Sequence, residues 1–87
     1  MKSPLNNYIA TFFSHYDALT FFNLIKERDM AAKISPVPRK VSASCGTCVS
    51  FASDSIPTFQ NCEIEAIYIE TNGKYSAVWT SDNDYHP

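Results

Sequence analysis

The sequence predicts an α+β fold, a ferredoxin-like β-α-β-β-(short α)-β sandwich with an added C-terminal β-hairpin strand. Three observations support it: an apolar run followed by a helix-start signal, short alternating segments after that helix, and an Asn-Gly turn between two β-type runs. At 87 residues the chain fits one domain, 1–87, and we expect an ordered core of about residues 7–80 and a polar tail over 81–87.

The first two elements follow from local signals. The run Tyr8–Phe13 is apolar on both alternating faces, as in an interior strand of a sheet. Ser14 then provides a helix cap and Asp17 an acidic first turn, so a helix should begin at about His15 and end in the polar segment Lys26–Arg28. Its spacing predicts that the face covering the sheet contains Ala18, Phe22 and Ile25, with Leu19 beside them.

The middle of the chain predicts an edge strand and a central one. Residues 32–38 alternate apolar with polar, but Pro36 and Pro38 remove ladder donors, which favours an edge position. In the following strand, Val49–Ala52, the side chains of Val49 and Phe51 should share one face and that of Cys48 should point to the other.

The C-terminal half predicts a short helix and a hairpin. Residues 53–62 have proline in a possible first turn, so we expect two helical turns at most. Segments 66–71 and 74–79 flank Asn72-Gly73, a strong hairpin signal because both residues tolerate positive φ.

Composition excludes several classes of function. The chain is 45% hydrophobic and has a net charge of -2 with scattered Lys and Arg, which does not favour nucleic acid as a partner. No apolar run approaches the roughly 18 residues of a membrane span, and the first residues do not resemble a secretory signal. We therefore expect a cytoplasmic protein, with reduced thiols, no metal and no cofactor.

The motif Cys45-Gly46-Thr47-Cys48 is the strongest candidate for chemistry. Two sulfurs separated by two residues can close a disulfide or share a soft metal ion. Gly46 permits a tight turn whose N–H groups would stabilise a thiolate or persulfide on Cys45, and Arg39 and Lys40 are close enough in sequence to add positive potential.

Other readings of the cysteines and histidines receive less support. Cys62 is expected to be a packed thiol, and Cys62, His15 and His86 stand at spacings unrelated to a zinc site. A thioredoxin-like protein would place the motif at a helix start, whereas here a strand follows it. His15 and His86 lack an acid or nucleophile partner at recognisable spacing.

The segment Pro36-Val37-Pro38-Arg39-Lys40-Val41-Ser42-Ala43-Ser44-Cys45-Gly46 resembles the selenium/sulfur (Se/S) carrier-like family of small bacterial domains. The family pattern is a Pro-x-Pro-Arg, a Ser-rich step that here ends in Ser44, and a Cys-Gly. The resemblance extends back over 8–30, where Ala18 matches a family alanine, and covers about the first fifty residues.

The resemblance implies a ferredoxin-like domain of selenium or sulfur metabolism in which Cys45 carries a persulfide or selenosulfide, surrounded by the motif residues Pro38, Arg39 and Gly46. The family's second helix is normally longer than 53–62 allows, and the hairpin after Asn72-Gly73 looks like an addition.

Three functions follow as hypotheses. The first is a carrier or accessory protein, rather than a stand-alone enzyme, that exchanges sulfur or selenium with donor and acceptor proteins, with Cys48 able to resolve the persulfide as a disulfide. The second is an interaction module or homodimer that uses Tyr75 and Trp79 as aromatic anchors. The third is a thiol-disulfide redox protein that uses Cys45 and Cys48.

Overall fold

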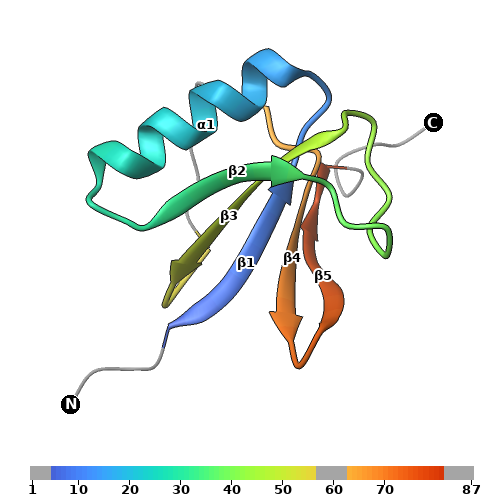
Figure 1. The fold of residues 1–87 in the computed structure, drawn as a ribbon. Coiled ribbons are helices and arrows are strands. Elements are labelled where there is room, and N and C mark those ends of the chain that lie inside the picture. Colours follow the sequence, from blue (N-terminus) through green and yellow to red (C-terminus); the bar gives the residue numbers. More distant parts are fainter. Residues whose placement is uncertain (1–4, 57–62, 82–87) are drawn as a thin grey trace.

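The computed structural model describes residues 5–56 and 63–81. Within them the chain forms a five-stranded antiparallel sheet with one helix packed on it (Figure 1). The elements are β1 (Asn6–Thr11), α1 (His15–Glu27), β2 (Ala32–Pro36), β3 (Thr47–Ser53), β4 (Ala66–Thr71) and β5 (Lys74–Thr80). The α+β class is therefore confirmed.

The strand order across the sheet is β2-β3-β1-β4-β5. β3 lies antiparallel between β1 and β2, so β1 and β2 run parallel and α1 connects them. This is a split β-α-β unit, to which β4 adds on the free side of β1. β5 lies at the edge of the sheet, and the described residues contain one helix. The strand order and the number of described helices therefore differ from those of the expected ferredoxin-like sandwich. The short helix expected over 53–62 falls largely outside the described residues, and the described part begins with Ser53 still in β3.

The helix begins and ends where local chemistry directs it. The Ser14 Oγ accepts a hydrogen bond from the Asp17 N–H at 3.2 Å and donates to the Asp17 carboxylate at 2.8 Å, which caps the first turn as expected. At the other end, Arg28 caps the helix and Asp29 takes a left-handed φ of 60°.

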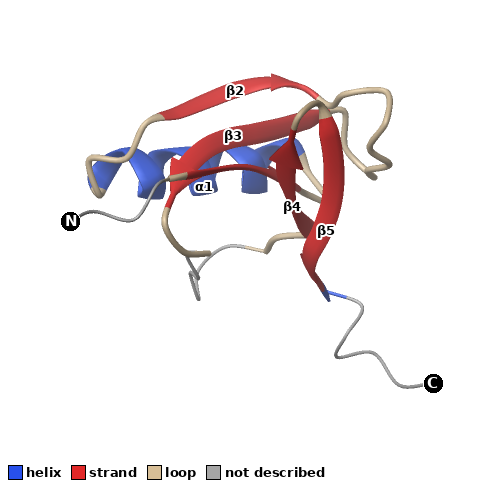
Figure 2. Cartoon of the chain, turned by 90° about the horizontal axis from the view of Figure 1, so that it is seen from below, coloured by secondary structure: helices blue, strands red, loops and turns tan. Residues whose placement is uncertain are grey.

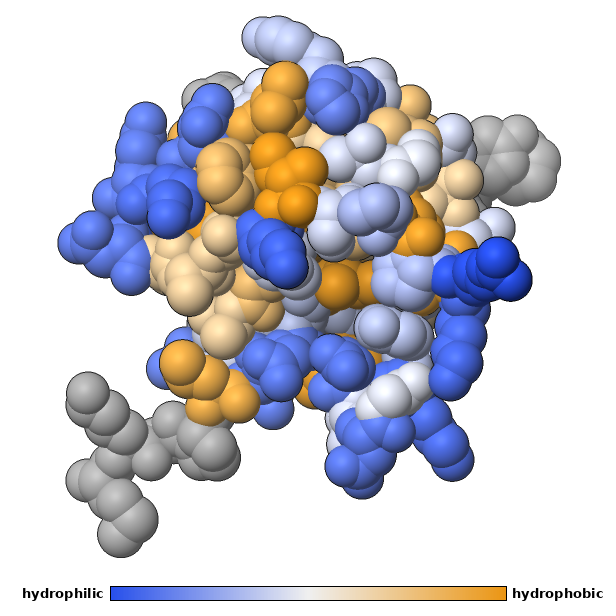
Figure 3. Space-filling view, viewed as in Figure 1, coloured by the Kyte–Doolittle hydropathy of each residue, from blue (hydrophilic) through white to orange (hydrophobic). Residues whose placement is uncertain are grey.

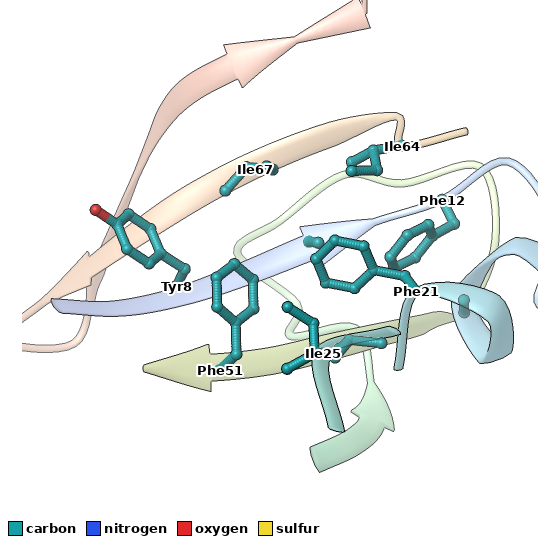
Figure 4. Close-up of a cluster of buried hydrophobic side chains, with 10 residues drawn as sticks. Tyr8, Phe12, Phe21, Ile25, Phe51, Ile64 and Ile67 are labelled. Atoms are coloured by element: carbon teal, nitrogen blue, oxygen red, sulfur yellow. The ribbon is translucent and has the colours of Figure 1, made fainter. Parts of the chain in front are cut away.

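The helix face that covers the sheet is one residue away from the prediction. Phe21, rather than Phe22, is fully buried with Ala18 and Ile25, while Phe22 lies at the margin and Leu19 is 41% exposed. Figure 4 shows Phe21 pointing from α1 into the cluster, where its ring lies 5.3 Å from that of Phe12 and 5.5 Å from that of Phe51. These aromatic contacts join helix and sheet.

The second face of the sheet carries a smaller cluster. Ile9, Val41 and Cys48 are buried there, with Val37, Tyr68 and Tyr75 packed against them. Val37 and Val41 come from the loop 37–46, seen in Figure 2 at the end of the sheet beyond β2 and β3. The sheet is thus covered by α1 on one face and partly by this loop on the other.

The C-terminal hairpin is confirmed. Asn72 and Gly73 have φ values of 53° and 79°, as a two-residue turn of the primed type requires. The β4–β5 register shifts between Ile67 and Tyr68, which leaves Val78 as an extra residue of β5.

The first strand was expected over Tyr8–Phe13, but β1 ends at Thr11 and Phe13 is exposed. No described helix is both long and apolar enough to cross a membrane.

Candidate functional site

Cys45 lies in the loop 37–46, which connects β2 to β3 at the end of the sheet where α1 begins (Figure 1). The Val37 N–H donates to the Gly46 carbonyl at 3.1 Å and closes the neck of this loop. A tight turn follows, in which the Val41 N–H donates to the Pro38 carbonyl at 3.0 Å. Because Val41 is also buried against the sheet, the loop is held at its neck and in its middle.

Both neighbours of the Cys45-Gly46 step bind distant parts of the chain. The Glu65 carboxylate accepts two hydrogen bonds from Ser44, at 3.0 Å from its N–H and 2.7 Å from its Oγ. On the other side, Thr47 Oγ1 lies 3.1 Å from Nδ1 of His15, the first residue of α1. Cys45 therefore lies between Ser44, which is bound by Glu65 just before β4, and Thr47, which contacts the helix, while Cys45 itself is partly exposed.

Cys48 has a different environment. It is the second residue of β3, fully buried on the face opposite α1, as its register predicts. Its Sγ lies 3.6 Å from the Ser35 Oγ and 3.7 Å from the Pro36 carbonyl oxygen. Burial raises the pKa of the Cys48 thiol above its ordinary value of 9.0, and the hydrogen bond with Ser35 offsets only part of that shift.

The two basic residues of the loop occupy separate positions. The Lys40 ammonium donates to the Gly73 carbonyl of the β4–β5 turn at 3.3 Å, which ties the loop to the hairpin. Arg39 is exposed, and Pro38 is half-buried and contributes its carbonyl to the turn. Gly46 does not adopt a left-handed φ, so its backbone does not demand glycine.

A comparison with protein-family models matches residues 7–79 to the family described as "Putative Se/S carrier protein-like". The chain belongs to this family. The match extends well beyond the first fifty residues and includes most of the β4–β5 hairpin, so the expectation that the hairpin is an addition is wrong. No curated protein and no solved structure matched the chain.

The described part of this Se/S carrier-like chain contains two thiols, Cys45 and Cys48, and neither forms a disulfide. Cys62 and His86 lie outside the described residues, as do the other residues of the expected tail after Ser81. The described residues contain no group of three or more His, Cys, Asp or Glu side chains placed to hold a metal ion.

The sequence did not predict the two residues, His15 and Glu65, that bind the segment around Cys45 from other parts of the chain. His15 was expected to lack a partner at recognisable spacing, yet it contacts the hydroxyl of a residue within the Cys-x-x-Cys motif. Glu65 stands just before β4, 21 residues from its partner Ser44, and nothing in the local sequence links the two. Neither contact has a local signal, since both arise from the folding of the sheet.

The aromatic anchors expected for an interaction module are not brought together. Tyr75 packs at the margin of the cluster around Ile9 and Cys48, whereas Trp79 packs at the margin of the cluster beneath α1. Figure 3 shows hydrophobic residues reaching the surface between hydrophilic ones on the viewed face. Large exposed apolar side chains are found at Leu5, Phe13, Tyr16, Leu19 and Val78.

Proposed function

We propose that this protein is a sulfur or selenium carrier whose reactive group is the Cys45 thiol. A persulfide on a donor protein, R–S–SH, would be attacked at its outer sulfur by the Cys45 thiolate. The donor S–S bond breaks, a new S–S bond forms at Cys45, and the donor leaves as a thiolate. The products are a Cys45 persulfide and R–S⁻, so no external oxidant or reductant is needed. A donor selenosulfide would give Cys45–S–SeH in the same way.

One observation carries the proposal: Cys45 is partly exposed in a loop held on both sides, in a chain that belongs to a carrier-like family. A carrier needs a thiol that a partner protein can approach, because transfer passes directly between sulfur atoms. Cys48 is buried and lacks that access. Its raised pKa also leaves a smaller fraction of thiolate near neutral pH than an ordinary cysteine has.

The burial of Cys48 also favours a carrier over a disulfide redox protein. If Cys48 attacked a Cys45 persulfide, the products would be a Cys45–Cys48 disulfide and sulfide, and the cargo would be lost. The Cys48 thiol is buried next to Ser35 and Pro36 of the neighbouring strand β2. An attack by Cys48 on a Cys45 persulfide would therefore require local opening of the sheet. We assign Cys48 a packing role that leaves the persulfide intact.

The remaining parts of the proposal concern fold and setting. We propose that the split β-α-β unit with β4 is a ferredoxin-like arrangement extended by β5. Donor and acceptor would both be thiol proteins, and the setting would be the cytoplasm, where thiols stay reduced. Arg39, exposed beside the turn at Pro38, is available to meet an acidic partner surface.

The test is sulfur transfer from a cysteine desulfurase supplied with cysteine, followed by mass spectrometry of intact and digested protein. We expect a gain of one sulfur atom on Cys45, retained in Cys48→Ser and absent in Cys45→Ser. Labelling of Cys48 or Cys62 in place of Cys45, or no labelling of the wild type by several desulfurases, would contradict the proposal.

A further inference from the structure

The Glu65 carboxylate reaches the residue directly before Cys45 from outside the loop. Its two oxygens accept from the backbone N–H and the hydroxyl of Ser44, at 3.0 and 2.7 Å. Two hydrogen bonds to one residue fix its position and its side-chain rotamer together, and bonds to a carboxylate are stronger than neutral ones. The backbone at Ser44 is thereby held one peptide away from the thiol-bearing residue.

The side chain of Glu65 starts from a fixed point. Its N–H donates to the Thr11 carbonyl at the end of β1, at 2.7 Å, and its carbonyl accepts from the Ser81 N–H at 3.0 Å. The half-buried Glu65 therefore connects the loop to the central strand and to the residue that follows β5.

Cys45 is the residue left between two anchored neighbours. Ser44 is bound by Glu65, and the Gly46 carbonyl accepts from the Val37 N–H at 3.1 Å. A sulfur that must meet the sulfur of another protein gains rate when its backbone is already oriented, because less freedom is lost on approach.

From this geometry we infer that Glu65 is a positioning residue for Cys45, acting through Ser44; the inference rests on the proposed carrier function. Loss of the two Glu65–Ser44 hydrogen bonds would leave the backbone beside Cys45 less fixed, and transfer to Cys45 would be slower.

The experiment compares Glu65→Gln and Ser44→Ala with wild type for the rate of persulfide transfer from a cysteine desulfurase to Cys45. Each variant should be slower by about tenfold. The double variant should be slower by less than the product of the two single effects, because both variants weaken the same Glu65–Ser44 pair. Ser44→Thr keeps the hydroxyl and should restore the rate. Matched controls are Glu70→Gln, which removes the same charge at the far end of β4, and Ser42→Ala, an exposed serine of the same loop.

A second measurement does not depend on sulfur transfer. Hydrogen exchange of the Ser44 amide should be at least about tenfold faster in Glu65→Gln, since its acceptor is weakened. Unchanged exchange, or transfer that is unchanged or faster in Glu65→Gln, overturns the inference while the carrier function stands. A wild-type protein that takes up no sulfur overturns the proposed function, and the positioning role with it.

Discussion

Cys45 and Cys48 lie three residues apart, yet Cys45 is partly exposed in the loop before β3 whereas Cys48 is completely buried within that strand. The Cys-x-x-Cys motif therefore does not present two equivalent sulfurs. Cys45 is partly accessible to solvent, and Cys48 belongs to the packing of the sheet with Ile9 and Val41.

The first prediction concerns selective alkylation. Iodoacetamide added to the native protein near neutral pH should modify Cys45 at least about 100-fold faster than Cys48, because Cys48 reacts only when the sheet opens locally. Fragmentation of the modified peptide assigns the site. In urea the two rates should converge, and equal native rates would show that Cys48 is accessible in solution.

The second prediction is a loss of stability at alkaline pH. The pKa of Cys48 in the folded protein lies above its ordinary value of 9.0, so the folded state holds this proton more tightly than the unfolded state. Stability from this group is complete below pH 9 and decreases as the pH rises through the folded pKa. Urea unfolding between pH 7 and pH 10 should show a decrease that is smaller in Cys48→Ala. The same slope in both proteins would assign the effect to other groups.

The third prediction compares residues along α1. Phe21→Ala should lower the free energy of unfolding by about 3–5 kcal/mol, because Phe21 is fully buried between Phe12 and Phe51. Leu19→Ala, at a 41% exposed position, should change it by about 0.5 kcal/mol or less. Urea denaturation measures both, with Phe22→Ala expected between them. A larger effect at Leu19 than at Phe21 would contradict the observed helix face.

The fourth prediction separates the two glycines. Gly73→Ala should cost about 1–2 kcal/mol, because its φ of 79° is left-handed although a Cβ would have space. Gly46→Ala should leave stability unchanged or raise it by up to about 1 kcal/mol, since its Cβ also meets open space and its φ is not left-handed. Thermal unfolding tests both. If Gly46→Ala then transfers sulfur more slowly, its glycine serves the approach of a partner rather than the fold.

Most of the fold could be predicted because its signals are local. The Ser14 cap with Asp17, the alternation around Val49 and the Asn72-Gly73 turn each act within a few residues, and each appears where expected. The choice between Phe21 and Phe22 was missed because both fit a helical repeat, and only the position of the sheet decides which one is buried.

The candidate site was only partly predictable. Its two cysteines, Gly46 and the basic pair Arg39 and Lys40 could be proposed from spacing, and the orientation of Cys48 away from Val49 follows from strand alternation. The contacts Ser44–Glu65, His15–Thr47 and Lys40–Gly73 join residues 21, 32 and 33 positions apart. Lys40 illustrates the difficulty: closeness to Cys45 in sequence suggested a charge beside the thiol, but its ammonium binds the hairpin turn.

The two hydrogen bonds between Glu65 and Ser44 can form only late in the synthesis of the chain, because the two residues are 21 positions apart. Cys45 leaves the ribosome well before Glu65, so the nascent loop lacks one of its anchors until β4 has emerged and paired with β1. Contacts between residues so far apart in sequence form late, after the cost of closing the intervening chain has been met. A chain truncated before β4 would keep the Val37–Gly46 hydrogen bond at the base of the loop but would lack the Glu65 contact, so Ser44 would become fixed only after β4 had joined the sheet.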